Sequence, residues 1–206
     1  METLESYLDR LASDVAVPGG GSAAAVSGAM GAALVAMVAR IARANPRNAE
    51  NIEALDAIAR RSDELRTELT KARALDEAAY QAVVNAQAMP KSNPDQERAR
   101  RQALDDALAR AAEEPLRSAK LNFELLRVAA RLLEFPVSAL SSDIGSAAEL
   151  AASALASCAY NVRVNHKYMR DAETIGAQRE VLRDTQSQSG ALLEQIRATI
   201  DSRLSA

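Results

Sequence analysis

The stretch Pro18–Ala39, PGGGSAAAVSGAMGAALVAMVA, decides the fold class of this chain of 206 residues. It has no charged residue, and after three consecutive glycines it consists mainly of Ala, Gly and Ser with a few large apolar side chains. The uncharged run from Val15 to Ala39 is longer than the roughly 20 residues that a membrane-spanning helix needs. Its many small residues favour a different interpretation, a central bundle helix that packs closely on its neighbours. We therefore expect a helix over residues 22–44 that lies in a protein core and not in a membrane.

The rest of the chain carries helix signals and almost no strand signals. Aromatic residues make up 3% of the sequence and helix-forming residues dominate, which predicts an all-α protein. Asn93 and Asp171 are expected N-caps, and Pro115 is expected to open or kink a helix. We predict one domain over residues 1–206, a bundle of about six to seven helices around the small-residue-rich central helix. The expected helices cover residues 3–13, 22–44, 49–87, 94–113, 115–134 and 143–168, with a last helix after Asp171.

Composition excludes several classes of function. The net charge of -3 and the pI near 5.4 provide no basic surface for nucleic acid or anionic lipid. One cysteine, Cys158, can form neither an intramolecular disulfide nor a zinc cluster. The N-terminus lacks the basic and then apolar layout of a signal peptide. We expect a cytoplasmic protein with no metal centre, although carboxylates could still hold magnesium.

Asp76 breaks the apolar pattern of the third expected helix. At 100° per residue, an apolar stripe passes within roughly 20° of this carboxylate. Burial would raise its pKa and make it a candidate general base or acid. Two other interpretations stay open: a paired structural aspartate, or a helix rotated so that Leu75 faces the core. The stripe consists of Leu65, Leu69, Ala72, Ala79 and Val83.

Three further features permit both a structural and a functional interpretation. Asp143 follows two serines at an expected helix start, where capping is the simpler role. His166 lies on an apolar stripe, and a single histidine provides neither a Ser-His-Asp triad nor a multi-histidine metal site. Gly19 to Gly21, with Ala24, match G-x-G-x-x-A, but no strand precedes them as in a dinucleotide fold. These glycines form either a helix–helix turn or a close contact with a ligand or another chain.

Four segments together resemble the cyclodeaminase/cyclohydrolase family, which includes the C-terminal half of formiminotransferase-cyclodeaminase. Residues 14–37 resemble the family's opening, and PGGGSAAA is its most specific mark. Residues 75–80, LDEAAY, followed by Met89-Pro90-Lys91, resemble the D-x-x-A-(F/Y) helix and its L-P-K end. Residues 142–145, SDIG, resemble the S-D-x-G turn, and residues 161–165, NVRVN, resemble N-V-x-(I/V)-N. The matches occur in family order over most of the chain.

The resemblance implies an all-helical homodimer that acts on one-carbon derivatives of tetrahydrofolate. It places Asp76 on the catalytic aspartate, as general base, and implies no permanently bound cofactor. Because the chain lacks a formiminotransferase half, we favour hydrolysis of 5,10-methenyltetrahydrofolate to 10-formyltetrahydrofolate. The alternatives are a formimidoyltetrahydrofolate cyclodeaminase that releases ammonia, and a non-catalytic folate-binding or assembly protein. The implied substrate-binding residues are Gly19, Gly20, Gly21, Ser22, Lys91, Asp143 and Asn165.

Three segments depart from the family pattern. Asn45-Pro46 replaces a more basic, glycine-containing segment. Pro136-Val137-Ser138-Ala139 stands where the family usually has an Asn-containing loop, and His166 stands where a small or aliphatic residue is common.

Overall fold

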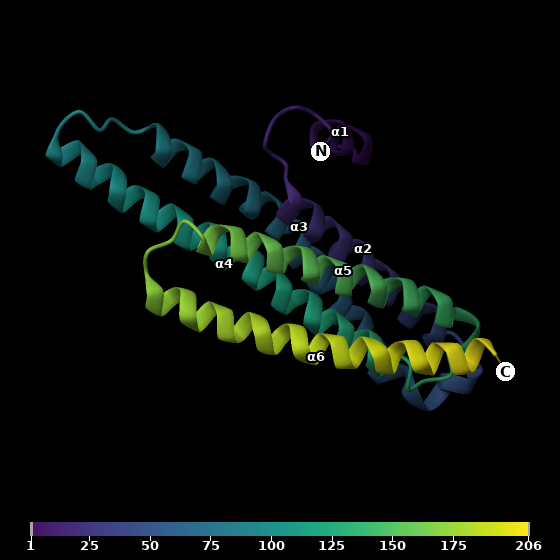
Figure 1. Ribbon diagram of the computed structural model, residues 1–206. Coiled ribbons are helices and arrows are strands. Elements are labelled where there is room, and N and C mark those ends of the chain that lie inside the picture. Colours follow the sequence, from purple (N-terminus) through teal and green to yellow (C-terminus); the bar gives the residue numbers. More distant parts are fainter. Residues whose placement is uncertain (1, 206) are drawn as a thin grey trace.

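The computed structural model describes residues 2–205 and confirms the all-α prediction, since none of these residues forms a strand. Six helices and two short 3₁₀ segments make up a bundle with a long hairpin projecting from one end (Figure 1). The elements are α1 (Leu4–Leu11), α2 (Gly20–Arg43), η1 (Pro46–Asn51), α3 (Ile52–Ala88), α4 (Pro94–Leu132), η2 (Ser138–Leu140), α5 (Ser141–His166) and α6 (Ala172–Leu204).

The predicted boundary at Pro115 is wrong, because α4 runs through this residue without a break. The fourth and fifth expected helices are therefore one. Pro115 and the neighbouring Ala112, Leu116 and Ala119 are all buried. Tertiary packing on both sides of the proline keeps the two halves of α4 in line and offsets the intrinsic cost of a proline in a helix interior.

The predicted helix starts at Asn93 and Asp171 are confirmed. Asn93 accepts a hydrogen bond from the backbone N–H of Gln96 at 2.9 Å, with Pro94 at the first helical position. Asp171 accepts from the N–H groups of Glu173 and Thr174 at 3.1 Å. The start of α5 differs from the expectation, because this helix begins at Ser141 without a side-chain cap and Asp143 lies in its first turn.

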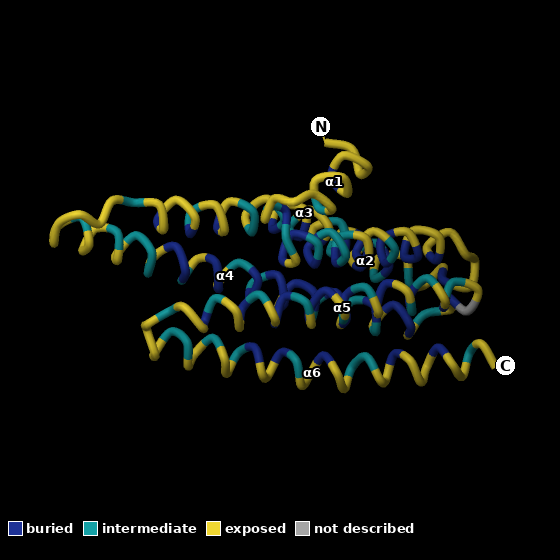
Figure 2. The backbone as a smooth tube through the Cα atoms, turned by 45° about the horizontal axis from the view of Figure 1, so that its top comes forward, coloured by how far each residue is buried: buried dark blue, intermediate teal, exposed yellow. Residues whose placement is uncertain are grey.

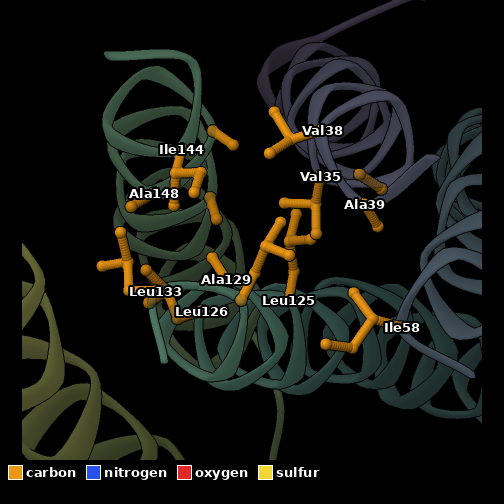
Figure 3. Close-up of a cluster of buried hydrophobic side chains, with 14 of the residues drawn as sticks. Val35, Val38, Ala39, Ile58, Leu125, Leu126, Ala129, Leu133, Ile144 and Ala148 are labelled. Atoms are coloured by element: carbon orange, nitrogen blue, oxygen red, sulfur yellow. The ribbon is translucent and has the colours of Figure 1, made fainter. Parts of the chain in front are cut away.

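The small-residue helix α2 packs on α3 and α5, as expected of a core helix, but one of its faces is exposed, so it is not enclosed on all sides. Figure 3 shows Val35 and Val38 of α2 directed into one apolar cluster with Leu125 of α4 and Ile144 of α5. A Cβ at Gly31 would lie 3.0 Å from the carbonyl oxygen of Ala147, so the small residue permits close approach of α2 and α5. By length and composition α2 is the one described helix that could cross a membrane, but 56% of its most apolar window is buried.

The hairpin of α3 and α4 extends beyond α2 and α5 (Figure 1). A separate apolar cluster of small and medium side chains, including Ala79, Val83, Ala107 and Leu108, joins its two helices. The outer face of α6 is exposed along its whole length (Figure 2), so α6 covers only one side of the core. The base of the hairpin, the first turn of α2 and the last turns of α5 surround a cleft.

Candidate active site

The cleft has a volume of about 580 Å³, within the range typical of small-molecule sites. Five segments contribute to it: the chain before α2, the first turn of α2, the last third of α3, part of α4, and the end of α5 with the turn that follows it. The lining residues are Ala16, Val17, Gly19, Gly20, Gly21, Asp76, Glu77, Tyr80, Val83, Gln87, Leu104, Leu108, Ala111, Asn161, Val164, Asn165 and Tyr168.

Asp76 lies against the start of α2 so closely that only glycine fits there. A Cβ built on Gly21 would lie 2.2 Å from Asp76 Oδ1, whereas at Gly19 and Gly20 the nearest atoms are at an acceptable 3.4 Å. The N-cap Gly19 has no side chain to bond the free N–H groups of the first turn. The carboxylate of Asp76 therefore approaches the positive end of the α2 dipole from α3. This contact explains the glycine at position 21.

Burial raises the pKa of Asp76 to about 6, although the backbone N–H of Ser22 stabilises the charged form. The charges that act on Asp76 are both negative, Glu77 and Glu114, and raise its pKa further. Among residues 2–205, no cation acts on Asp76, so the interpretation of Asp76 as an ion-paired structural residue is not supported. The rotated-helix alternative is wrong, because Leu75 is 44% exposed while the predicted stripe from Leu65 to Val83 is buried.

The charge of the neighbouring carboxylate, Glu77, is compensated by arginine side chains that do not contact Asp76. Its Oε1 accepts a hydrogen bond from Ser22 Oγ at 3.0 Å, and its Oε2 lies 3.0 Å from Arg10 Nη2. Tyr7 OH lies 2.9 Å from Ser22 Oγ, and Arg73 approaches Glu77 at 3.7 Å. Since Ser22 gives its only hydroxyl proton to Glu77, the Tyr7 hydroxyl is the donor to Ser22. The site thus contains two adjacent carboxylates, one compensated by arginines and one not.

Two asparagines of α5 form the opposite wall of the cleft. Asn165 Nδ2 donates to the carbonyl oxygens of Ala111 and Asn161, at 2.7 and 2.8 Å. Asn161 Nδ2 donates to Ser157 O at 2.9 Å. Both amide hydrogens of Asn165 are bound to backbone carbonyls, so its oxygen is the group left for a ligand, whereas Asn161 keeps one amide hydrogen as well as its oxygen.

Sequence analysis did not single out Asn161, Glu77, Tyr80 or Tyr168 as cleft residues. Asn161 had a usable signal, because it precedes Asn165 by four residues and so shares its helix face. Tyr80 and Tyr168 are exposed in spite of their size, and they provide aromatic surface at the cleft. Glu77 lies on a polar flank of α3, and two of its partners, Arg10 of α1 and Ser22 of α2, reach it only through the packing of other helices.

The structure brings Gly19, Gly20, Gly21, Asp76 and Asn165 together in the cleft, and buried Ser22 lies directly behind it. Lys91 and Asp143 do not line it. Lys91 is exposed in the turn between α3 and α4, four residues beyond the cleft residue Gln87. Asp143 lies in the first turn of α5, about 27 Å along the helix from Asn161.

The three departures from the family pattern lie outside the cleft lining. Asn45 lies between the end of α2 and η1, and Pro46 is the first residue of η1. Pro136–Ala139 belong to the turn that leads into α5, at the opposite end of this helix from Asn161 and Asn165. His166 is buried, and its Nε2 lies 2.7 Å from Oε1 of Gln178 in α6. In the described part of the chain, no three His, Cys, Asp or Glu side chains gather as a metal site requires.

Comparison with known proteins agrees with this geometry. The sequence model of the family described as Formiminotransferase-cyclodeaminase matches residues 3–184, which include every residue of the cleft. The chain belongs to this family. It is thus an enzyme of the cyclodeaminase and cyclohydrolase group, as the four sequence motifs indicated.

Two members of the formiminotransferase-cyclodeaminase family match the chain over nearly its whole length. A protein of Methylorubrum extorquens named methenyltetrahydrofolate cyclohydrolase is 36% identical over 203 residues, 98% of each chain. The crystal structure of formiminotetrahydrofolate cyclodeaminase from Thermotoga maritima superimposes with a TM-score of 0.89 at 25% identity, again over 98% of each chain.

Proposed function

We propose that this protein hydrolyses 5,10-methenyltetrahydrofolate to 10-formyltetrahydrofolate, with Asp76 as the general base. The observation that carries the proposal is an uncompensated carboxylate in a cleft, with its pKa raised by burial to about 6. The Methylorubrum relative, which matches from end to end, supports the choice of substrate. A base with this pKa is ionised at neutral pH and still accepts protons efficiently.

The cleft suits a flat, positively charged heterocycle. The bridging carbon of 5,10-methenyltetrahydrofolate belongs to an amidinium cation, which the negative charge of Asp76 stabilises. The first turn of α2 presents backbone without side chains, so a ring can lie directly against Gly19 and Gly20. Tyr80 and Tyr168 supply aromatic surface for the ring system.

The reaction requires placement of one water molecule and movement of its protons. Asp76 accepts a proton as the water oxygen bonds to the bridging carbon, which yields a neutral carbinol. When the bond from this carbon to N5 breaks, N5 takes the proton from Asp76, and the hydroxyl loses its proton as the formyl C=O forms. One proton is released overall, so Asp76 ends each turnover ionised. No step requires a bound cofactor.

The remaining implied residues receive distinct roles in this proposal. Gly19 and Gly20 contact the ring, and Asn165 contacts its polar edge. Gly21 leaves room for the Asp76 carboxylate, and Ser22 supports the site from behind through its hydrogen bond to Glu77. Lys91 lies beyond the outer end of the cleft, where its charge suits a carboxylate of the folate side chain. The length of α5 places Asp143 too far from Asp76 to reach the same ring, so any contact requires a second copy of the chain.

The second candidate function is the cyclodeaminase reaction, favoured by the near-complete structural match to the Thermotoga enzyme. In that reaction N10 attacks the formimino carbon and ammonia leaves. Asp76 would accept the proton from N10 and return one to the departing nitrogen. Both reactions place the same carboxylate beside the same carbon, so the geometry of Asp76 serves either.

We also propose a cytoplasmic homodimer that pairs through the exposed face of α2. This face carries Met30, Met37 and Ile41, which are 47%, 38% and 49% exposed, and α2 has no charge before Arg40. An uncharged apolar patch of this kind is characteristic of a protein–protein interface. A second copy is the occupant that the family resemblance implies.

The decisive experiment measures the decay of 5,10-methenyltetrahydrofolate absorbance with the parent protein and with Asp76→Asn. We expect the substitution to lower kcat by about 10²- to 10⁴-fold. Because Asp76 must be ionised, kcat/KM of the parent should fall as the pH drops through about 6. Asp184→Asn, on the exposed face of α6, is the matched control. Full activity of Asp76→Asn would refute its role, and ammonia release from formimidoyltetrahydrofolate with no acceleration of methenyl hydrolysis would favour the deaminase.

A further inference from the structure

Pro115 affects a hydrogen bond between the backbone of α4 and a side chain in the wall of the cleft. A proline has no N–H, so the carbonyl oxygen four residues earlier, that of Ala111, receives no helical hydrogen bond from position 115. In the structure this oxygen accepts the hydrogen bond from Asn165 Nδ2, at 2.7 Å. Ala111 and Asn165 both line the cleft. The proline therefore leaves an acceptor on α4 for a side chain of α5.

The hydrogen bond from Asn165 to Ala111 fixes the orientation of the asparagine side chain. The second hydrogen of its amide is used as well, because Nδ2 also lies 2.8 Å from the carbonyl oxygen of Asn161. Both partners are carbonyl oxygens, which only accept hydrogen bonds, so the amide cannot be reversed without losing both. The oxygen Oδ1 is the polar atom of Asn165 that remains for a ligand.

We propose that Pro115 is a positioning residue, which holds Asn165 so that Oδ1 accepts a hydrogen bond from a ring N–H donor of the substrate. The inference rests on the proposed function, since the pterin of a folate offers an amino group and ring N–H groups as donors. Asp76 and Glu77 are also acceptors, so the cleft matches a ligand edge that is rich in donors. An N–H at position 115 would compete for Ala111 O and release the amide.

The test compares Pro115→Ala, Asn165→Ala and the double variant in turnover of 5,10-methenyltetrahydrofolate. We expect each single variant to raise KM by about two- to tenfold, the value of one neutral hydrogen bond, with kcat nearly unchanged. In the Asn165→Ala background, Pro115→Ala should change KM by less than about twofold, because the side chain that it positions is gone. An equal rise of KM in both backgrounds, or no rise in either, would overturn the proposal.

Unfolding and loss of positioning are separated by two further measurements. We expect Pro115→Ala to unfold at a temperature no lower than the parent, because alanine suits a helix interior far better than proline. Hydrogen exchange of the Asn165 side-chain amide, followed by NMR, should become faster in Pro115→Ala. Pro94→Ala, at the exposed first position of α4, should leave this exchange unchanged.

The NMR readout does not depend on any activity. Faster exchange in a protein without turnover would therefore uphold the role of Pro115 while refuting the proposed function. Unchanged exchange would overturn the positioning role, whatever the kinetics.

Discussion

At the scale of single residues, the candidate site depends on Asp76 and Gly21. The carboxylate reaches the start of α2 only because Gly21 has no Cβ, and its contact with that turn partly compensates its burial. Two other glycines, Gly176 and Gly190 in α6, have no atom within 4 Å of an added Cβ. Gly21 is therefore required because a side chain would not fit, whereas Gly176 and Gly190 have room for one.

Gly21→Ala should abolish most activity, because its Cβ would lie 2.2 Å from Asp76 Oδ1 and would displace the general base. We expect a loss of about 100-fold or more, comparable to removal of the carboxylate. The measurement is the methenyl absorbance assay. Gly190→Ala is the control, and it should retain activity and gain about 0.5–1 kcal/mol of stability. A fully active Gly21→Ala enzyme would show that Asp76 does not need this position.

Asp76 also makes the stability of the protein depend on pH. Its pKa is raised from 3.8 to about 6 in the folded state, so the folded protein retains a proton that the unfolded chain releases between these values. The protonated carboxyl contributes its full stability below about pH 4, and this contribution is lost as the pH rises through about 6. Above pH 7 the buried charge costs up to about 3 kcal/mol.

Asp76→Asn should therefore be more stable than the parent at pH 7.5, with the difference vanishing near pH 4. The measurement is urea unfolding of both proteins at several pH values. A stability difference that is constant over this range would mean that Asp76 has an ordinary pKa.

At the scale of elements, the short helix α1 joins the bundle through a few side chains only. Tyr7 is the one buried residue of α1 and contacts Ser22, while Arg10 pairs with Glu77. The guanidinium of Arg73 lies 5.2 Å from the centre of the Tyr7 ring. An eight-residue helix is too short to be stable alone, so α1 depends on these contacts.

Tyr7→Ala should release α1 without unfolding the bundle. Amide hydrogen exchange of residues 4–11 should become faster by about tenfold or more, while the core of α2 keeps its protection. Activity should fall as well, because Ser22 and Glu77 lose their partners on α1. Leu8→Ala is the matched control, since Leu8 is half exposed on the same helix. Protection of α1 that survives Tyr7→Ala would show that other contacts hold it.

At the scale of the whole molecule, two faces of α2 have different roles. One side forms the core with α3 and α5, and another presents Met30, Met37 and Ile41 to the outside. Burial of these exposed side chains in a dimer would remove them from water, and this hydrophobic contribution would stabilise the dimer.

Met30→Lys should convert the proposed dimer into a monomer, because a charge at the centre of an apolar interface is costly to bury. The mass in solution, from light scattering or sedimentation, is the measurement. Leu204→Lys, at the exposed end of α6, should leave the mass unchanged. A parent protein that is already monomeric at micromolar concentration would contradict the proposed dimer.

Much of the fold and part of the site could be predicted from local sequence. Helix periodicity placed Asp76 on the buried stripe of α3, and the capping residues Asn93 and Asp171 begin their helices as expected. Motif similarity brought Gly21 and Asn165 to one site. These predictions succeed because helical periodicity, caps and motifs depend on residues only a few positions apart.

Only the tertiary structure decided the features that depend on contacts between distant segments. The sequence suggested a break at Pro115, but packing on both sides keeps α4 continuous, and the carbonyl freed there meets Asn165 from another helix. The pairing of Glu77 with Arg10 likewise requires α1 to fold back onto α3. The sequence by itself determined the all-helical class, most of the helices and the identity of the family, because these are encoded locally. The tertiary structure decided which carboxylate is left without a cation, because that depends on which charges the fold brings near it.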